Sequence, residues 1–356
     1  MFSLGMGVKG GEFARGFFTP SLLVVAMRRV LHIGPCDTPG GMATVMHTLA
    51  EFPPEGWQAD LLASHAPGGL WAKWRAYRSA LKELKRRCQS ENERPDIIHV
   101  HTAADWSWRR KRRFALIANE AGCNIIIHVH SGQFDTWLES PHSSQSRKMR
   151  AVLQKTNAKT IVLSEWWKER LHPLIGSTEV VHNPVGKTFV AGNRSRNKDH
   201  ILLLGRNDPV KGHAFGIKVC QLIRETGLDL RVTMSGITSS PYPWLEARGW
   251  MSDEEKLRLL QTASLLIVPS EFEGEPLVVL EAISCGLPVL TSDRLHSLPS
   301  SIEVAPFKDE GAWASKIIQL LQQPTDPLLL MEHSKQYNIE TISNKWREVY
   351  QGLLDQ

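Results

Sequence analysis

Two glutamates eight positions apart in the second half of the chain could serve the chemistry of a phosphorylated sugar. The segment Glu-Gly-Glu-Pro-Leu at 273–277 follows an apolar run, and Glu281 comes about two helical turns later. A loop that opens a helix offers free backbone N–H groups and the positive end of the helix dipole, which together hold a phosphate. Glu281 could accept hydrogen bonds from a ribose, and Glu273 would face the reacting sugar. The spacing alone also fits two ordinary helical glutamates.

A second group of polar residues could hold a diphosphate. It is the turn Gly-Arg-Asn-Asp-Pro-Val-Lys-Gly at 205–212, which follows an apolar run and precedes a helical pattern. Arg206 offers a planar fork of donors and Lys211 offers a point charge, and both suit phosphate oxygens. The turn does not match the G-x-x-x-x-G-K-[ST] loop. The competing interpretation is an ordinary strand-to-helix turn with exposed cations.

Glycines and histidines in the first half complete the set of candidate site residues. Gly40 and Gly41 follow the first apolar run, where the backbone can approach a ligand and a helix start favours an anion. His130 stands where an expected strand meets its loop. Two His-x-His pairs, at 99–101 and 128–130, raise the question of a metal site. No acidic ligand pattern accompanies them, so the sequence favours core or cleft-lining histidines and no metal.

Short apolar runs alternate with amphipathic stretches along almost the whole chain. Such runs are typical of parallel strands buried on both faces, with helices on both sides of the sheet. The expected strands are 30–34, 96–100, 124–128, 160–163 and 180–182, then 201–205, 230–235, 265–269, 288–291 and 302–304. Helical patterns include 71–89, 212–225, 253–262 and 310–321. Because ligands bind at the carboxyl ends of such strands, two facing sheets would form a cleft.

The pattern restarts near residue 200, which divides the chain into two α/β domains. We expect a leader or a disordered extension at 1–26, a Rossmann-like domain at 27–183, a polar linker at 184–199 and a second Rossmann-like domain at 200–340. A final helix at 341–356 is expected to pack back on the first domain. The 356 residues are 42% apolar and 22% charged, which excludes a mostly disordered or polytopic membrane protein. Five widely spaced cysteines without a C-x-x-C motif indicate a reducing compartment.

Positive charge is concentrated in the first half. Residues 1–183 carry 24 basic and 16 acidic side chains, whereas 184–356 carry 18 and 21. Segment 71–113 alone has 13 basic and 5 acidic residues, with several tryptophans among them. Tryptophan beside Lys and Arg suits an anionic membrane surface, so we expect peripheral association through Trp71–Arg113. The competing interpretation is a solvated helix whose aromatics pack inward, and no recognised motif supports nucleic acid as a partner.

In this order and spacing, the motifs resemble those of retaining glycosyltransferases of family 4. That family has the GT-B fold, in which two Rossmann-like doubly wound domains face each other across a cleft. The resemblance runs from about residue 27 to the C-terminus. Its looser N-terminal segments are Gly-Gly 40–41, Pro-Asp-Ile-Ile-His-Val-His 95–101, His-Ser-Gly 130–132 and Val-His-Asn-Pro-Val 181–185. Its more specific C-terminal segments are Gly-Arg 205–206, Lys-Gly 211–212, Pro-Ser 269–270 and Glu-Ala-Ile-Ser-Cys-Gly-Leu-Pro-Val 281–289, together with the glutamate pair.

The resemblance implies a role for each matching residue. His130 and Glu273 would be catalytic and would contact the transferred sugar. The donor would be bound by Gly41, Arg206, Lys211, Gly274, Glu275, Pro276, Leu277 and Glu281. Because Arg, Lys and helix ends would stabilise the departing diphosphate, no metal or other cofactor is expected.

Two departures from the family pattern change the expectations. After the first glutamate the family commonly has Gly-Phe-Gly, whereas this chain has Gly274-Glu275-Pro276, so Glu275 would influence which sugar is accepted. The linker commonly reads Pro-Asn-Gly, and here it reads His182-Asn183-Pro184. Neither departure removes a charge that the phosphates need.

The resemblance predicts retaining transfer of a hexose from a UDP- or GDP-linked sugar to a hydroxyl of a glycan or lipid-linked acceptor. The expected setting is cell-envelope or surface polysaccharide synthesis, in the cytoplasm and on the inner face of the membrane. One alternative is a nucleotide-sugar epimerase, which would need no acceptor. The other is a non-catalytic GT-B module that binds a nucleotide or a partner, since fold alone does not decide function.

Overall fold

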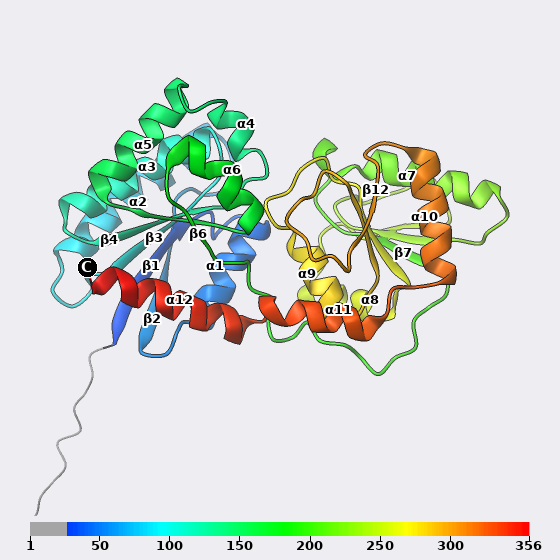
Figure 1. Ribbon diagram of the computed structural model, residues 1–356. Helices are drawn as coiled ribbons and strands as arrows, with labels where there is room; N and C mark the ends of the chain where they lie inside the picture. Colours follow the sequence, from blue (N-terminus) through cyan, green and yellow to red (C-terminus); the bar gives the residue numbers. More distant parts are fainter. Residues whose placement is uncertain (1–26, 356) are drawn as a thin grey trace, which may run out of the picture.

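The computed structural model describes residues 27–355, so the leader expected at 1–26 lies outside the described residues. Two domains stand side by side, each built on a six-stranded parallel sheet between helices (Figure 1). The predicted fold class, α/β with two doubly wound parallel sheets, is confirmed. Within residues 27–355, no helix combines the length and the apolar character that a membrane span requires.

The first sheet has the strand order β2-β1-β3-β4-β5-β6. Its strands are β1 (Arg28–Gly34), β2 (Trp57–Ala63), β3 (Ile97–Thr102), β4 (Asn124–Val129), β5 (Lys159–Val162) and β6 (Glu179–Val180). The helices of this half are α1 (Gly41–Glu51), α2 (Leu70–Gln89), α3 (Trp106–Glu120), α4 (Phe134–Leu138), α5 (Ser144–Thr156) and α6 (Glu165–Ile175). Side chains of α2, α3, α5 and α6 form the core on one face of the sheet, and α1 covers the other face.

The second sheet has the order β12-β11-β10-β7-β8-β9. Its strands are β7 (His200–Leu203), β8 (Arg231–Met234), β9 (Leu245–Ala247), β10 (Leu265–Val268), β11 (Val289–Ser292) and β12 (Glu303–Ala305). The helices are η1 (Pro209–Lys211), α7 (His213–Glu225), α8 (Asp253–Thr262), α9 (Leu277–Ser284), α10 (Glu310–Gln322), α11 (Pro327–Ser334) and η2 (Lys335–Tyr337). Helices α7 and α10 pack on one face, and α8, α9 and α11 pack on the other.

Two of the observed strands, β2 and β9, were not predicted from the sequence, and both lie at sheet edges. Among residues 27–355, strand β2 pairs only with β1, and β9 pairs only with β8. Most side chains of β2 are only half-buried, so its sequence Trp-Gln-Ala-Asp-Leu-Leu-Ala lacks the continuous apolar run of a central strand. Strand β9 has three residues, too few for a recognisable pattern.

Helix α12 (Ile339–Leu354) carries the chain back from the second domain to the first (Figure 1). Asn338 caps its start by accepting a hydrogen bond from the backbone N–H of Thr341 at 2.7 Å. Its apolar side chains, among them Trp346 and Tyr350, are buried with residues of β1, β3, β4 and β5 in one core cluster. The end of the chain is therefore part of the first domain's core.

Segment 184–199, between the two sheets, is packed rather than loose. Val185 and Phe189 belong to the core of the second domain. The Arg196 guanidinium donates to the carbonyl oxygens of Leu260, Ala263 and Cys285 at 2.7–3.0 Å. These contacts hold the segment against the second domain.

We predict that Trp346→Ala destabilises the first domain. Trp346 is fully buried and its ring packs 4.5 Å from that of His99, so truncation leaves a large cavity. Loss of a buried tryptophan costs about 3–5 kcal/mol of unfolding free energy, which urea denaturation can measure. Trp71→Ala is the matched control, because Trp71 is 79% exposed. The control should change the unfolding free energy by about 0.5 kcal/mol or less. Equal losses in the two variants would contradict this account.

Candidate active site

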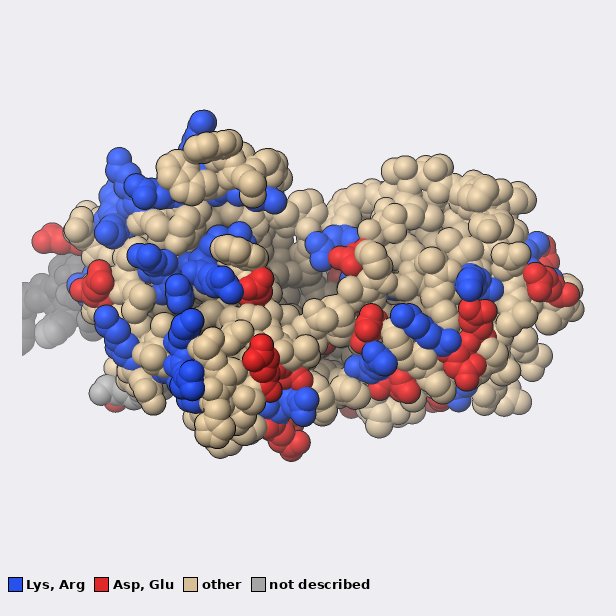
Figure 2. Space-filling view, turned by 90° about the horizontal axis from the view of Figure 1, so that it is seen from above, with Lys and Arg blue, Asp and Glu red and all other residues tan. Residues whose placement is uncertain are grey.

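A cavity of about 370 Å³ lies between the two domains, where a hollow is visible from above (Figure 2). It is bordered by the start of α1 and the end of β4 from the first domain, and by loops after β7 and β10 from the second. This is the carboxyl edge of both sheets, where ligands bind in open parallel folds. Every residue that the sequence analysis assigned to a site lines this one cavity: Gly41, His130, Arg206, Lys211, Glu273, Gly274, Glu275, Pro276, Leu277 and Glu281.

Two glycines let the loops of the two domains meet at the cavity. A Cβ on Gly274 would lie 2.3 Å from the carbonyl oxygen of His130, and a Cβ on Gly132 would lie 2.4 Å from the carbonyl carbon of Glu273. Both positions therefore exclude a side chain while the backbones stay in place. The indole N–H of Trp167 adds a hydrogen bond to the Gly274 carbonyl at 2.9 Å. His130 and Glu273 are brought together by this contact.

Lys211 is held over the cavity by a short, capped turn. Asp208 accepts a hydrogen bond from the backbone N–H of Val210 at 3.1 Å, which starts η1. Gly212 follows with φ of +72°, and a Cβ there would lie 2.6 Å from the Pro269 carbonyl oxygen. At the tip, the Lys211 ammonium forms an ion pair with Glu273, which also accepts from the Ser270 hydroxyl at 3.0 Å.

Arg206 offers a second positive charge at the same edge. Its side chain is exposed, and no described residue accepts a hydrogen bond or forms an ion pair with it. Across the cavity, the backbone N–H groups of α9 begin at Leu277, and the first turn of α1 begins at Gly41. Two cations and two helix N-termini therefore surround the same space, an arrangement that suits a diphosphate.

Glu281 is buried in α9 beneath the cavity. One carboxylate oxygen accepts a hydrogen bond from the Lys256 ammonium at 2.8 Å, and the other has no partner among the described residues. Burial raises the pKa of Glu281, an effect that the charge of Lys256 opposes. An unpaired carboxylate oxygen beside the cavity is costly unless a ligand supplies a donor. Lys256, which lines the cavity from α8, carries no motif in the sequence and was not predicted.

The structure corrects the expectation for the Glu275 carboxylate. That side chain is fully buried and accepts hydrogen bonds from His182 Nδ1 at 2.7 Å and from the Asn183 backbone N–H at 2.6 Å. The Asn183 amide in turn donates to the Glu275 carbonyl at 3.0 Å. The carboxylate therefore points to the linker, where the two departures from the family pattern meet each other. The expectation that this carboxylate influences which sugar is accepted has no support in this geometry, because the carboxylate is buried against the linker.

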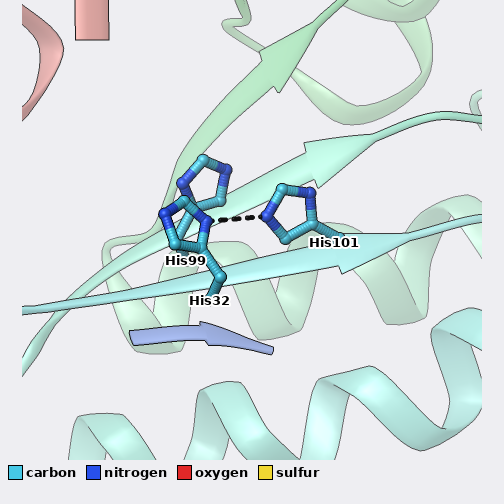
Figure 3. Close-up of side chains that lie close together, drawn as sticks. All are labelled: His32, His99 and His101. Carbon is cyan, nitrogen blue, oxygen red and sulfur yellow. Dashed lines mark hydrogen bonds between the residues drawn. The ribbon is translucent and has the colours of Figure 1, made fainter. Parts of the chain in front are cut away.

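Five histidine side chains pack against one another on one face of the first sheet, behind the cavity. They come from three neighbouring strands: His32 from β1, His99 and His101 from β3, and His128 and His130 from the end of β4. Figure 3 shows three of them, with a hydrogen bond of 3.0 Å between His32 and His101. Burial lowers the pKa of His32 and of His130 to about 3, and it lowers the pKa of each of the others well below 6.5.

The stacking of His99 and His101 does not suit a single metal bound by both of these rings. A ring nitrogen directs its lone pair in the plane of the ring. The rings of His99 and His101 are stacked with centroids 4.3 Å apart and planes only 10° apart, so near the rings no point lies in both planes. His101 Nδ1 and His101 Nε2 are each within 3.0 Å of another imidazole nitrogen, which is hydrogen-bond distance. The cluster is a hydrogen-bonded stack.

Family comparisons divide the chain as the two sheets do. Residues 39–187 match the model described as "Glycosyltransferase Family 4". Residues 198–323 match the model described as "Glycosyl transferases group 1". Together the two matches span about three quarters of the chain and include every predicted site residue.

Individual relatives are distant. Glycogen synthase of Mycobacterium tuberculosis is 24% identical over 270 residues, which cover 68% of this chain and 64% of that protein. Lipopolysaccharide 1,6-galactosyltransferase of Salmonella typhimurium is 25% identical over 248 residues, which cover 60% and 66%. The matches thus span less than two thirds of the length of these relatives. Among solved structures, sucrose-phosphate synthase from Thermosynechococcus elongatus shares the fold, with a TM-score of 0.69 at 16% identity, covering 92% of this chain and 99% of that chain.

We predict that acid destabilises this protein through the histidine stack. The native histidines stay neutral to well below pH 6.5, whereas in the unfolded chain each recovers a pKa near 6.5. Below that pH the unfolded chain binds more protons than the native one, so the free energy of unfolding falls as the pH falls. Each histidine should contribute roughly 1 kcal/mol per pH unit, measured by urea denaturation between pH 7 and 5. An unfolding free energy that does not change over this range would contradict the prediction.

Proposed function

Because this chain belongs to the family 4 (group 1) glycosyltransferases of the GT-B fold, we propose that it transfers a hexose from a nucleotide-diphosphate sugar, UDP- or GDP-linked, to a hydroxyl group. The observation that carries the proposal is the convergence of all ten predicted residues on one cavity between the two domains. A site with residues from both domains suits a two-substrate reaction, because one domain can present the acceptor to a donor bound by the other.

The donor is proposed to lie against the second domain. Its diphosphate would contact Arg206, Lys211 and the N-terminus of α9, which supply positive charge where the leaving group becomes more negative. Its ribose hydroxyls would donate to Glu281, whose second carboxylate oxygen has no partner among the described residues. With these groups in place, the chain's own cations serve where other enzymes use a divalent ion.

The transferred sugar is proposed to sit between His130 and Glu273. Glu273 already accepts from Lys211 and Ser270, which supports a role in positioning the sugar rather than in attacking it. We propose a retaining reaction in which the acceptor oxygen attacks from the face that the diphosphate leaves. The acceptor hydroxyl loses its proton to a phosphate oxygen of the leaving group while the new glycosidic bond forms and the old one breaks.

The acceptor is proposed to be a glycan or lipid-linked glycan in polysaccharide synthesis, reached at an anionic membrane surface. Trp71, Trp74 and Trp106 are 79%, 55% and 66% exposed on α2 and α3. Arg78 and Arg109 lie over two of these rings, at 5.5 and 5.0 Å. Lys and Arg also gather over the first domain in the face seen from above (Figure 2). Aromatic side chains with cations beside them support binding to the headgroup region on the inner face of a membrane.

We predict that a donor nucleotide sugar stabilises the protein through Lys211. Thermal unfolding against UDP-, GDP- and ADP-sugars should shift with one nucleotide, by about 2.7 kcal/mol at 100 times its Kd. Lys211→Ala should abolish the shift. The matched control is Lys218→Ala on the outer side of α7, where Lys218 is 70% exposed, and it should keep the shift. No shift with any nucleotide, or a shift that survives Lys211→Ala, would contradict the donor assignment.

We predict that the protein sediments with vesicles of phosphatidylglycerol and not with vesicles of phosphatidylcholine. Trp71→Ala with Trp74→Ala should weaken binding severalfold, and added salt should weaken it further. Leu328→Ala with Leu329→Ala on α11 is the control, because these exposed apolar residues lie on the other domain. Equal binding to both vesicle types, or none, would rule out the membrane surface.

A further inference from the structure

The histidine stack contains a hydrogen-bonded chain that leads from the core to the cavity. His130 Nε2 lies 2.9 Å from His101 Nδ1, and His101 Nε2 lies 3.0 Å from His32 Nδ1. His130 lines the cavity, and its Nδ1 has no hydrogen-bond partner among the described residues. His101 and His32 are at most 1% exposed. Of these three hydrogen-bonded histidines, His130 alone reaches the cavity. Its Nε2 faces His101, so its Nδ1 is the nitrogen left for a ligand.

A neutral chain of this kind has only two hydrogen-bonding patterns. Each neutral imidazole carries one N–H, so each nitrogen–nitrogen contact holds a single proton. If His32 Nδ1 donates to His101, then His101 donates to His130, and the proton of His130 is on Nδ1. If the direction is reversed, His130 Nδ1 is a bare acceptor. The proton positions of the three imidazoles are therefore coupled, and the direction of the two bonds sets whether His130 offers the cavity a donor or an acceptor.

Neighbouring groups keep the chain neutral and hold its rings in place. His99 stacks on His101 at 4.3 Å, and His128 lies against His130 with centroids 4.0 Å apart. His99 itself bonds to His128 and to the Tyr350 hydroxyl, at 3.1 Å each, so this second chain ends on α12. Burial and the nearby charge of Lys111 oppose protonation of His130 and lower its pKa. Rotation of the His130 ring would break its bond to His101.

We infer that His101 is a positioning residue, which orients the His130 ring and fixes which of its nitrogens carries the proton facing the cavity. A sugar hydroxyl at that nitrogen would meet a partner of one defined hydrogen-bonding character, with no reorganisation when the ligand arrives. The consequence for catalysis rests on the proposed function, whereas the tautomer of His130 can be observed without it.

The decisive test compares three substitutions of His101. An asparagine amide reaches about as far as Nδ1 and can still meet His130, whereas a glutamine amide reaches toward Nε2 and His32, and phenylalanine keeps only the ring shape. In protein labelled with ¹⁵N-histidine, the ring nitrogen shifts report the tautomer, and His130→Asn assigns the signals. We expect a single tautomer of His130 in the wild type, and a change of the tautomer ratio that is larger in His101→Gln and His101→Phe than in His101→Asn, because only the asparagine amide still reaches His130. Equal behaviour of the Asn and Gln variants would overturn the inference, even if the Phe variant does not fold.

Turnover gives a second readout, with the donor identified by the thermal shifts. We expect kcat to fall about tenfold in His101→Gln while the donor KM changes less than twofold, and His101→Asn to recover most of the loss. Tyr350→Phe is the control, because it removes a buried hydrogen bond of the second chain that His130 does not share. If kcat falls as much in Tyr350→Phe as in His101→Gln, His101 contributes only to packing, and the inference is contradicted. If the wild type transfers no sugar, the proposed function fails, and the tautomer spectra still decide the role of His101.

Discussion

The contact between the His130 loop and the Glu273 loop is the constraint on which the cavity depends. Each loop belongs to a different domain, and each needs a glycine, at 132 and 274, to let the other backbone approach. Without this contact, the candidate catalytic residues would lie on separate walls. Close to it, the Ser164 and Ser297 hydroxyls bond at 2.8 Å and the rings of Trp166 and His296 stack at 4.7 Å, so several ties hold the domains on this side.

The connections between the domains reinforce the same arrangement. Glu275 bonds to His182 and Asn183 where the chain leaves the first domain, and helix α12 brings the chain back into the core of that domain. Burial alone would lower the pKa of His182, but the Glu275 carboxylate beside it raises that pKa above its usual value. Burial raises the pKa of Glu275, and the hydrogen bonds from His182 and from the Asn183 backbone N–H oppose that rise. A buried carboxylate with two donors holds a linker more firmly than a solvated one, because losing either donor leaves it unsatisfied.

The charged side chains of the cavity are partly paired with one another and partly left for a ligand. Lys211 pairs with Glu273 and Lys256 pairs with Glu281, so two of the cations are already neutralised by carboxylates. Arg206 is exposed, and the second oxygen of Glu281 has no partner among the described residues. A ligand with both phosphate and hydroxyl groups could bond to both, with its phosphates accepting from Arg206 and its hydroxyls donating to Glu281. A simple anion would satisfy only Arg206 and would compete with Glu273 for Lys211.

The α/β class, ten of the twelve described strands and ten residues that line the cavity could be predicted from the sequence, because continuous apolar runs and polar strand-to-helix turns are local patterns. The sequence could not reveal the edge strands β2 and β9, the Lys256 partner of Glu281 or the inward turn of Glu275. Each of these features depends on which distant segment lies opposite, and that is set by the packing of the whole chain. The histidines make the same point: two His-x-His pairs were visible in the chain, but His32 joins them only because β1 lies beside β3 in the parallel sheet. Strand alternation places such side chains on one face, whereas the strand order, set by the packing of both faces, decides which of them meet.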